Sequence, residues 1–305
     1  MCLDDCDGRH LTRRQMIVGS TAALVAACAD RAAGPSPATQ APESTAASRA
    51  EASVVGSEVS FENGPTKVAA LLFRPEAAPA SPAVLVGDGN PGFAPWLRDL
   101  CERIAGQGLS VLYIDWMSRM PPFPSEAADQ GAWRRQAGSA ALWRAGASDF
   151  TAGLRWMRDG GVAHPKMAAA VGFCGGGVVL AHHAAQGAAL RALVLFYANA
   201  RISNSFQNPE DPLPDLVDIA GLIKVPVQAH YGAHDKTAKL DDARELEQRM
   251  VAAGRRPAFH YYADAGHGFM TAGEPLEADL TWGYVPAAAA AAEERMLGTL
   301  RASLR

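Results

Sequence analysis

The stretch that decides the fold is AAAVGFCGGGVVL, at residues 168–180. Its first half is an apolar run typical of a buried strand, and it passes through glycines straight into a second apolar run with helical character. Cys174 stands at the junction, two residues after Gly172 and two residues before Gly176. A nucleophile at such a turn has a strained backbone, and larger side chains two positions away would collide with it. The spacing therefore predicts a nucleophile elbow with Cys174 at its tip.

Two other interpretations of this stretch stay open, namely an inert cysteine in a glycine-rich turn and a phosphate-binding loop. A phosphate-binding loop would carry a lysine or the pattern G-x-G-x-x-G, and neither is present. An elbow would place Cys174 at a helix N-terminus, where the helix dipole favours the thiolate. Because the thiolate is the reactive form of cysteine, this position at a helix N-terminus favours Cys174 as a nucleophile.

An elbow predicts a carboxylate and then a histidine later in the chain, each at the end of a later strand. The run VPVQAHYGAHD, residues 225–235, ends in Asp235, and the run FHYYADAGHGF, residues 259–269, contains His267 between two glycines. Taken alone, Asp235 would be interpreted as a turn residue and His267 as a structural one. Behind an elbow, we expect His267 to exchange a proton with Cys174 and Asp235 to fix its tautomer.

Short β-rich runs alternate with helical patterns from Val54 onward, which predicts an α/β fold with a single doubly wound, mainly parallel sheet of about eight strands flanked by helices. The expected strands lie near Val54–Phe61, Lys67–Arg74, Ala83–Val86, Ser110–Ile114, Ala168–Phe173, Ala192–Tyr197, Val225–His230 and Ala258–Tyr262. The expected helices lie near Trp96–Gly106, Ala137–Met157, Gly175–Ala185, Leu240–Ala253 and Pro286–Ser303. Two long segments, Trp116–Gln136 and Ala200–Leu222, are expected to be irregular lids or pocket walls.

Residues 1–29 are expected to be an export signal. The pair Arg13 and Arg14 stands before an apolar stretch that is too short for a membrane-spanning helix of about 20 residues. This arrangement is similar to a twin-arginine signal, and an ordinary secretory signal is the alternative. The sequence LVAAC ending at Cys28 resembles a lipobox, which predicts a lipidated Cys28 and a location in the bacterial periplasm or on its membrane. Residues 30–53 are expected to be a disordered linker, and residues 54–305 the folded domain.

The net charge limits the classes of partner that the chain can bind, and the positions of the cysteines limit which of them can serve chemistry in the folded domain. The net charge of −4 gives no basic surface field for nucleic acid, so we expect a small-molecule partner. Three of the five cysteines, Cys2, Cys6 and Cys28, lie in the signal, and Cys101 is expected in the core. Neither a metal nor a cofactor is expected; His182 and His183, being adjacent on a helix, point to different faces.

Three motifs carry a resemblance to a known family: GFCGGG at residues 172–177, GAHD at residues 232–235 and AGHGF at residues 265–269. They resemble the motifs of the dienelactone hydrolase family, a branch of the α/β-hydrolase superfamily with cysteine where most members carry serine. The resemblance covers roughly Val54 to Arg301. It implies the α/β-hydrolase fold, a triad of Cys174, His267 and Asp235, a thioester acyl-enzyme, and hydrolysis of a lactone or ester without a cofactor.

The run VLVGDGNPGF, residues 84–93, occupies the place where this fold supplies its second oxyanion donor. We expect one donor to be the backbone N–H of Gly175 and the other that of Gly89 or Asn90. Members of the family often have a glutamate here that contacts the resting cysteine. Asp88 is the nearest carboxylate, and the alternative is that Asp88 is a turn residue.

Family members that act on dienelactone hold its carboxylate with arginines, one of them shortly after the catalytic histidine. Residues 268–273 contain no arginine, so the resemblance does not extend to that substrate. The arginines on or beside the expected irregular segment either line the pocket or are simply solvated; these are Arg119, Arg134, Arg135 and Arg144. Two alternatives to an ester or lactone hydrolase remain: a thioesterase or acyl transferase using the same triad, and a lipid-anchored periplasmic binding protein without activity.

Overall fold

The structure is a computed structural model that describes residues 53–76, 80–202, 210 and 212–305. The expected export signal with Cys28, and all of the expected linker except residue 53, lie outside the described residues. In the described part, no helix combines the length and the apolar character that crossing a bilayer requires.

The described residues form one eight-stranded sheet in the order β1-β2-β4-β3-β5-β6-β7-β8. The first two neighbouring pairs, β1 with β2 and β2 with β4, are antiparallel, and all other neighbours are parallel. This confirms the expected α/β class with a mainly parallel sheet. The strands are β1 (Val54–Asn63), β2 (Thr66–Pro75), β3 (Ser81–Gly87), β4 (Ser110–Asp115), β5 (Ala163–Phe173), β6 (Leu193–Phe196), β7 (Val227–Gly232) and β8 (Ala258–Tyr262).

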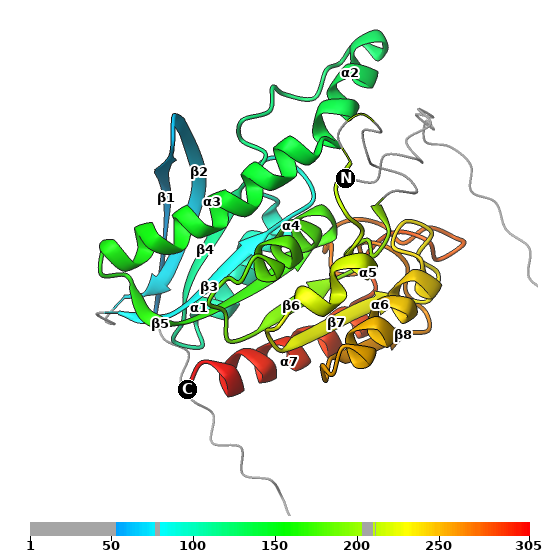
Figure 1. Cartoon of the computed structure of the whole chain (residues 1–305). Helices are drawn as coiled ribbons and strands as arrows, with labels where there is room; N and C mark the ends of the chain where they lie inside the picture. The colour runs from blue at the N-terminus through cyan, green and yellow to red at the C-terminus, as the bar shows by residue number, and fades with distance from the viewer. Residues whose placement is uncertain (1–52, 77–79, 203–209, 211) are drawn as a thin grey trace, which may run out of the picture. The chain divides into compact units, whose positions relative to one another are not determined.

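Helices cover both faces of the sheet (Figure 1). They are α1 (Pro95–Ala105), α2 (Ala127–Ala137), α3 (Ala140–Asp159), α4 (Cys174–Ala185), α5 (Leu216–Ile219), α6 (Leu240–Ala252) and α7 (Pro286–Ser303), with a short 3₁₀ turn at Ala220–Leu222. On one face α1 and α7 are joined by an ion pair in which Nε of Arg103 lies 2.7 Å from Oε1 of Glu293. The other face carries α3, α4, α5 and α6, each packed against the next.

The segment Trp116–Gln136, expected to be irregular, contains helix α2, so that expectation was wrong for its second half. The sequence of α2, AADQGAWRRQA, has almost no apolar stripe, and for this reason the helical period is not visible in it. Trp133 anchors the helix, since its indole N–H donates to the carbonyl of Pro121 at 2.7 Å. The helix expected from Ala137 begins instead at Ala140, capped by the Ser139 hydroxyl, which accepts from the N–H of Leu142.

The segment Ala200–Leu222 is also less irregular than expected. Its end is ordered as α5 and the 3₁₀ turn, while residues 203–209 and 211 lie outside the described part.

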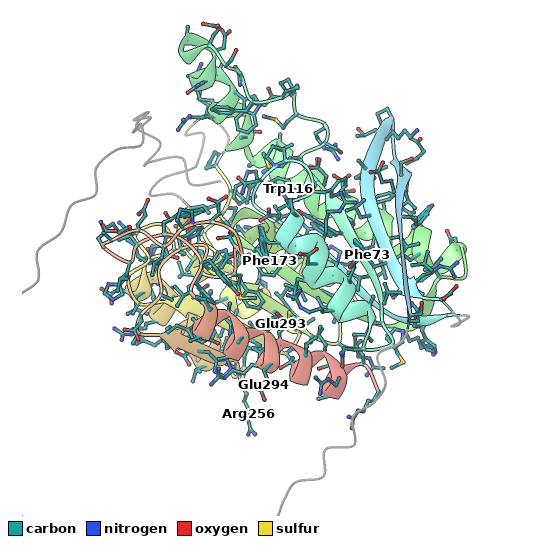
Figure 2. The ribbon with its side chains drawn as sticks, turned by 180° about the vertical axis from the view of Figure 1, so that it is seen from behind. Phe73, Trp116, Phe173, Arg256, Glu293 and Glu294 are labelled. Carbon is teal, nitrogen blue, oxygen red and sulfur yellow. The ribbon has the colours of Figure 1, made fainter. Side chains whose placement is uncertain are left out.

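The core lies on both faces of the central strands, whose side chains are buried all round. Phe73, Trp116 and Phe173 are among its large side chains (Figure 2). The Phe173 ring stacks on Phe196 of β6 at 4.6 Å and meets the edge of Trp96 at 5.1 Å. This packing fixes the ends of β5 and β6 against α1. The carboxyl ends of β3, β5, β6 and β7 meet at one edge of the sheet, which is where α/β folds place their ligands.

Candidate active site

Cys174 sits at a sharp turn between β5 and α4. It is the first residue of the helix, and its φ of 47° lies in the left-handed region that non-glycine residues rarely adopt. Such strain is stored mostly at functional sites, because the surrounding structure must hold it in place. The turn therefore has the geometry predicted for a nucleophile elbow.

Two glycines make this turn possible. A Cβ atom on Gly172 would lie 2.5 Å from Cα of Gly177, and one on Gly176 would lie 2.3 Å from the carbonyl carbon of Gly87. Both contacts are with backbone, which cannot move aside. The backbone of α4 thus lies directly against β5 and β3, and the glycine spacing seen in the sequence follows from this close approach.

His267 and Asp235 form a buried hydrogen-bonded pair. Nδ1 of His267 lies 2.8 Å from Oδ2 of Asp235, and because an ionised carboxylate can only accept, Nδ1 carries the proton. Oδ1 of Asp235 accepts from the N–H groups of Thr237 and Ala238, both at 2.7 Å. The backbone N–H of His267 donates to the carbonyl of Thr281 at 2.8 Å. These bonds leave Nε2 as the ring nitrogen available for proton exchange.

The side chains of Cys174 and His267 line the same cavity and interact with each other. Burial raises the pKa of the Cys174 thiol, whereas the charge of His267 and a side-chain hydrogen bond with it lower that pKa. The structure thus brings together the three residues that the sequence selected, in the order sulfur, imidazole, carboxylate. This arrangement can ionise a thiol by moving its proton to the neighbouring ring.

The loop after β3 lies beside the elbow. Asp88 is buried, and burial raises its pKa, while the N–H of Gly89 donates to its Oδ1 at 2.7 Å and lowers it. The indole of Trp116 donates to the carbonyl of Asp88 at 2.7 Å. A Cβ on Gly175 would lie 3.3 Å from Cα of Gly89, so these two expected oxyanion donors are neighbours. The N–H of Gly89 is, however, bonded to Asp88 in this structure.

A cavity of about 570 Å³ opens onto Cys174. Its lining includes the predicted residues Asp88, Asn90, Cys174 and His267, and also residues that sequence reasoning missed, above all Phe93, Trp96, Tyr197, Glu274 and Trp282. The ring of Trp282 stacks on His267 with centroids 5.4 Å apart, and that of Tyr197 lies 4.8 Å from it.

Tyr197 could have been found from the sequence, because it directly follows β6 at the same edge of the sheet. Its φ of 38° marks a second strained position beside the site. Trp282 gives no such signal, because it reaches the site from a long loop without helical or strand periodicity.

The four arginines considered from the sequence do not line this cavity. Arg119 forms an ion pair with the buried carboxylate of Asp149, which explains its position. The guanidinium of Arg134 lies over the ring of Phe123, 5.8 Å from its centroid. Arg135 and Arg144 are exposed. The interpretation that they line the pocket was therefore wrong.

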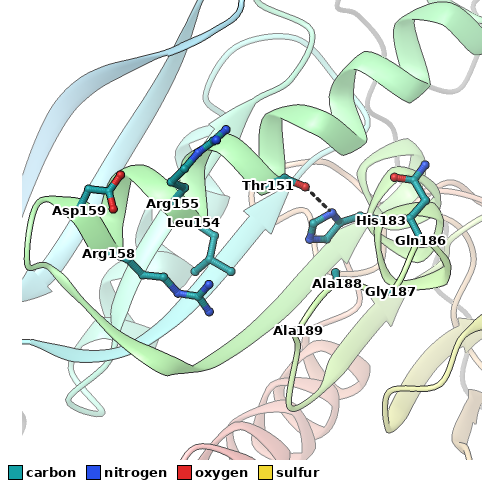
Figure 3. Close-up of a pocket in the computed structure, with 10 residues that line it drawn as sticks. All are labelled: Thr151, Leu154, Arg155, Arg158, Asp159, His183, Gln186, Gly187, Ala188 and Ala189. Atoms are coloured by element: carbon teal, nitrogen blue, oxygen red, sulfur yellow. Dashed lines mark hydrogen bonds between the residues drawn. The ribbon is translucent and has the colours of Figure 1, made fainter.

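A second cavity of about 480 Å³, between α3 and the end of α4, shares no lining residue with the first (Figure 3). His183 reaches it, with Nδ1 3.3 Å from the hydroxyl of Thr151. His182 and His183 are both buried, and burial lowers the pKa of each to about 4. Within the described ranges, no group of three or more His, Cys, Asp or Glu side chains is placed to hold a metal ion.

Comparison with known proteins identifies the family. A family model described as the dienelactone hydrolase family matches residues 68–304, which is most of the chain. The chain belongs to the dienelactone hydrolase family. A protein of Salmonella typhimurium, provisionally named a carboxymethylenebutenolidase, is 30% identical over 235 residues, covering 75% of this chain and 80% of that protein. A carboxymethylenebutenolidase of Pseudomonas putida is 28% identical over 236 residues, or 76% of this chain and 89% of that enzyme.

Solved structures show the same fold. A protein of Klebsiella pneumoniae, provisionally titled a dienelactone hydrolase, superposes with a TM-score of 0.69 at 23% identity and covers 82% of this chain and 99% of its own. The dienelactone hydrolase of Anabaena variabilis gives a TM-score of 0.59 at 17% identity, covering 83% of this chain and 99% of its own. The family and its named members make this chain a hydrolase of the dienelactone hydrolase type.

Proposed function

We propose that the chain hydrolyses an ester or lactone with Cys174 as nucleophile, His267 as general base and Asp235 as the residue that orients His267. The observation that carries this proposal is the position of Cys174. It lies at the tip of the elbow and lines a cavity, beside a histidine that is itself held by a buried carboxylate. A thiol, a base and an orienting acid in this relation are the requirements of nucleophilic catalysis.

In the acylation step His267 first accepts one proton and later donates it to the leaving alcohol. His267 takes the proton of the Cys174 thiol, and the sulfur attacks the carbonyl carbon of the substrate to give a tetrahedral oxyanion. The C–O bond to the alcohol then breaks, and the alcohol oxygen takes the proton from His267. A thioester on Cys174 remains, and for a lactone the alcohol stays attached to the acyl group.

Deacylation repeats these events with water. His267 accepts a proton from the water molecule that attacks the thioester, and the C–S bond breaks. The sulfur leaves as a thiolate and recovers its proton from His267. The carboxylic acid product is released, so the cycle balances without a redox or metal cofactor.

The oxyanion needs hydrogen-bond donors, and Gly175 with Asn90 is the pair that we favour. The N–H of Gly175 lies in the first turn of α4, where backbone N–H groups have no intrahelical acceptor. Asn90 lines the cavity. Gly89 becomes a donor only after its bond to Asp88 breaks, and we propose that Asp88 holds this loop beside the resting thiol.

The three-residue site also suits thioester hydrolysis or acyl transfer, which differ only in the leaving group or the acceptor. Turnover of a panel of esters, lactones and thioesters by the purified protein and by Cys174→Ala separates these cases. The proposal predicts turnover of esters or lactones that Cys174→Ala lacks. Absence of any turnover by the intact protein would favour the non-catalytic binding protein.

We also infer from residues 1–29 that the chain is exported, and from LVAAC that Cys28 anchors it to a membrane. Replacing Arg13 and Arg14 with lysine should leave the precursor in the cytoplasm if the signal is of the twin-arginine type. Unimpaired export of that variant would favour an ordinary secretory signal.

A further inference from the structure

Apart from the triad, the residues that line the active-site cavity are mainly aromatic, and two of them are acidic. Four aromatic side chains line it: Phe93, Trp96, Tyr197 and Trp282. Two carboxylates line it as well, Asp88 and Glu274. Among the lining residues of the described part there is neither a lysine nor an arginine.

Packing outside the cavity fixes the aromatic walls in place. Phe93 meets the ring of Tyr113 edge-on at 5.1 Å, and Trp96 meets Phe173 edge-on at the same separation. Trp282 packs instead on a residue of the cavity itself, nearly parallel to the ring of His267, with 20° between the ring planes. Rigid aromatic faces favour apolar groups and, through their negative faces, cations.

Glu274 is held at the cavity by its backbone. Its N–H donates to the carbonyl of Thr271 at 3.1 Å, and its carbonyl accepts from the N–H of Tyr284 at 3.2 Å. The side chain is exposed, and none of the ion pairs among the described residues includes it. Lys236, next to Asp235 in the sequence, is engaged with Asp279 at 2.9 Å. Glu274 is therefore an exposed carboxylic side chain at the cavity that is not neutralised by a described residue.

The second carboxylate of the cavity is less accessible to a substrate. Asp88 is buried, and its Oδ1 accepts from the N–H of Gly89 at 2.7 Å. Glu274 is consequently the exposed carboxylate among the lining residues. A substrate carboxylate would meet this charge and would lose water without gaining a cationic partner, which is costly.

We infer, on the basis of the proposed hydrolase function, that Glu274 determines substrate charge in this site. The substrate class is an ester or lactone that carries an apolar or cationic group and no carboxylate. A quaternary ammonium group fits best, because the aromatic walls and the Glu274 carboxylate both attract it. An uncharged group of the same shape ranks second, and a carboxylate ranks last.

Three matched esters of 4-nitrophenol test this order. Their acyl groups are 4-(trimethylammonio)butyrate, its uncharged carbon isostere 5,5-dimethylhexanoate, and hemiadipate. Values of kcat/KM are divided by the alkaline hydrolysis rate of each ester, which removes intrinsic reactivity. We expect this normalised kcat/KM to be highest for the cationic ester, lower for the uncharged ester and lowest for the anionic ester. Glu274→Gln should lower the ratio of cationic to anionic kcat/KM about tenfold, and Glu274→Lys should invert the preference.

The matched control is Glu294→Gln, which removes the same charge from an exposed position on α7 (Figure 2). It should leave the ratio unchanged. Added salt should reduce the preference of the wild type, because screening weakens the interaction with an exposed charge. Equal ratios in the wild type and in Glu274→Gln would overturn the inference.

A binding measurement keeps this test separate from the proposed chemistry. Quenching of tryptophan fluorescence by the same three esters gives their Kd values for Cys174→Ala and for Cys174→Ala with Glu274→Gln. The inference predicts tightest binding of the cationic ester and loss of that advantage in the double variant. Undiminished turnover by Cys174→Ala would refute the proposed nucleophile alone, whereas Kd values that do not respond to Glu274→Gln would refute only the charge selection.

Discussion

The carboxylate of Asp235 lies 2.8 Å from Nδ1 of His267, and both side chains are almost completely shielded from water. The other carboxylate oxygen is held by two backbone N–H groups, so Asp235 cannot turn away from the ring. In such surroundings the hydrogen bond fixes one tautomer and directs Nε2 toward the sulfur. The relationship predicts that the negative charge of Asp235, and not only its shape, matters for turnover.

Asp235→Asn should lower kcat/KM for an activated ester on the order of 10³-fold, because an amide either loses the charge that stabilises the imidazolium or presents a donor to Nδ1 and selects the wrong tautomer. Stopped-flow release of 4-nitrophenol measures this loss. Asp241→Asn, which changes an exposed acid on α6, is the control and should retain full turnover. A rate for Asp235→Asn within tenfold of the wild type would remove Asp235 from its assigned role.

Gly176→Ala should destabilise the fold by about 3 kcal/mol or more, because the new Cβ would lie 2.3 Å from the backbone of Gly87. Urea unfolding followed by circular dichroism gives the free energy of unfolding. Gly298→Ala in α7 is the matched control. A Cβ there meets nothing within 4 Å, so this change should stabilise the protein by up to about 1 kcal/mol. Equal effects of the two changes would contradict the close approach at the elbow.

Stability should fall as the pH is lowered from 7 to 5, in part because of His183. Burial lowers its pKa from 6.5 to about 4, so between these values the unfolded chain binds the proton that the folded chain rejects. At pH 5 this difference in pKa lowers the free energy of unfolding by about 2 kcal/mol. His183→Gln should therefore lose less stability than the wild type over this range, as measured by urea unfolding at both pH values. Identical losses would show that His183 does not titrate as described.

The two cysteines of the described residues should differ in reactivity. Cys174 lines the cavity and lies beside His267, whereas Cys101 is inside α1, where burial raises the pKa of its thiol far above the ordinary value. Iodoacetamide at neutral pH should label Cys174 and spare Cys101, which peptide mass spectrometry detects directly. Preferential labelling of Cys101 would contradict the assignment of their environments.

Much of this site could be predicted from the sequence because each of its central residues comes at or shortly after the carboxyl end of a strand in the parallel part of the sheet. Cys174 follows β5, and Asp235 and His267 come shortly after β7 and β8. In a parallel sheet these ends meet at one edge, so strand periodicity and chain order were enough to select the three residues. All eight strands were expected from their β-rich runs, including β1 and β8 at the edges of the sheet, which are only partly buried.

Two residues of the cavity wall could not be predicted in this way. Trp282 and Glu274 lie on the long loop between β8 and α7, whose course depends on tertiary contacts such as the bond from the N–H of His267 to Thr281. Helix α2 escaped prediction because its sequence has almost no apolar stripe and the helix depends on the single Trp133 for its anchoring. The role expected for Gly89 depends on a local bond to Asp88 that spacing alone does not reveal.

The most direct test of the central claim is the kcat/KM of Cys174→Ala and Cys174→Ser for an activated ester, together with their thermal midpoints. Cys174→Ala should lose turnover with a nearly unchanged midpoint. Cys174→Ser should lose about a hundredfold or more, since a hydroxyl needs full removal of its proton in a site that suits a thiolate. This loss corresponds to an activation barrier higher by about 2.7 kcal/mol. Full ester turnover by Cys174→Ala would contradict the account.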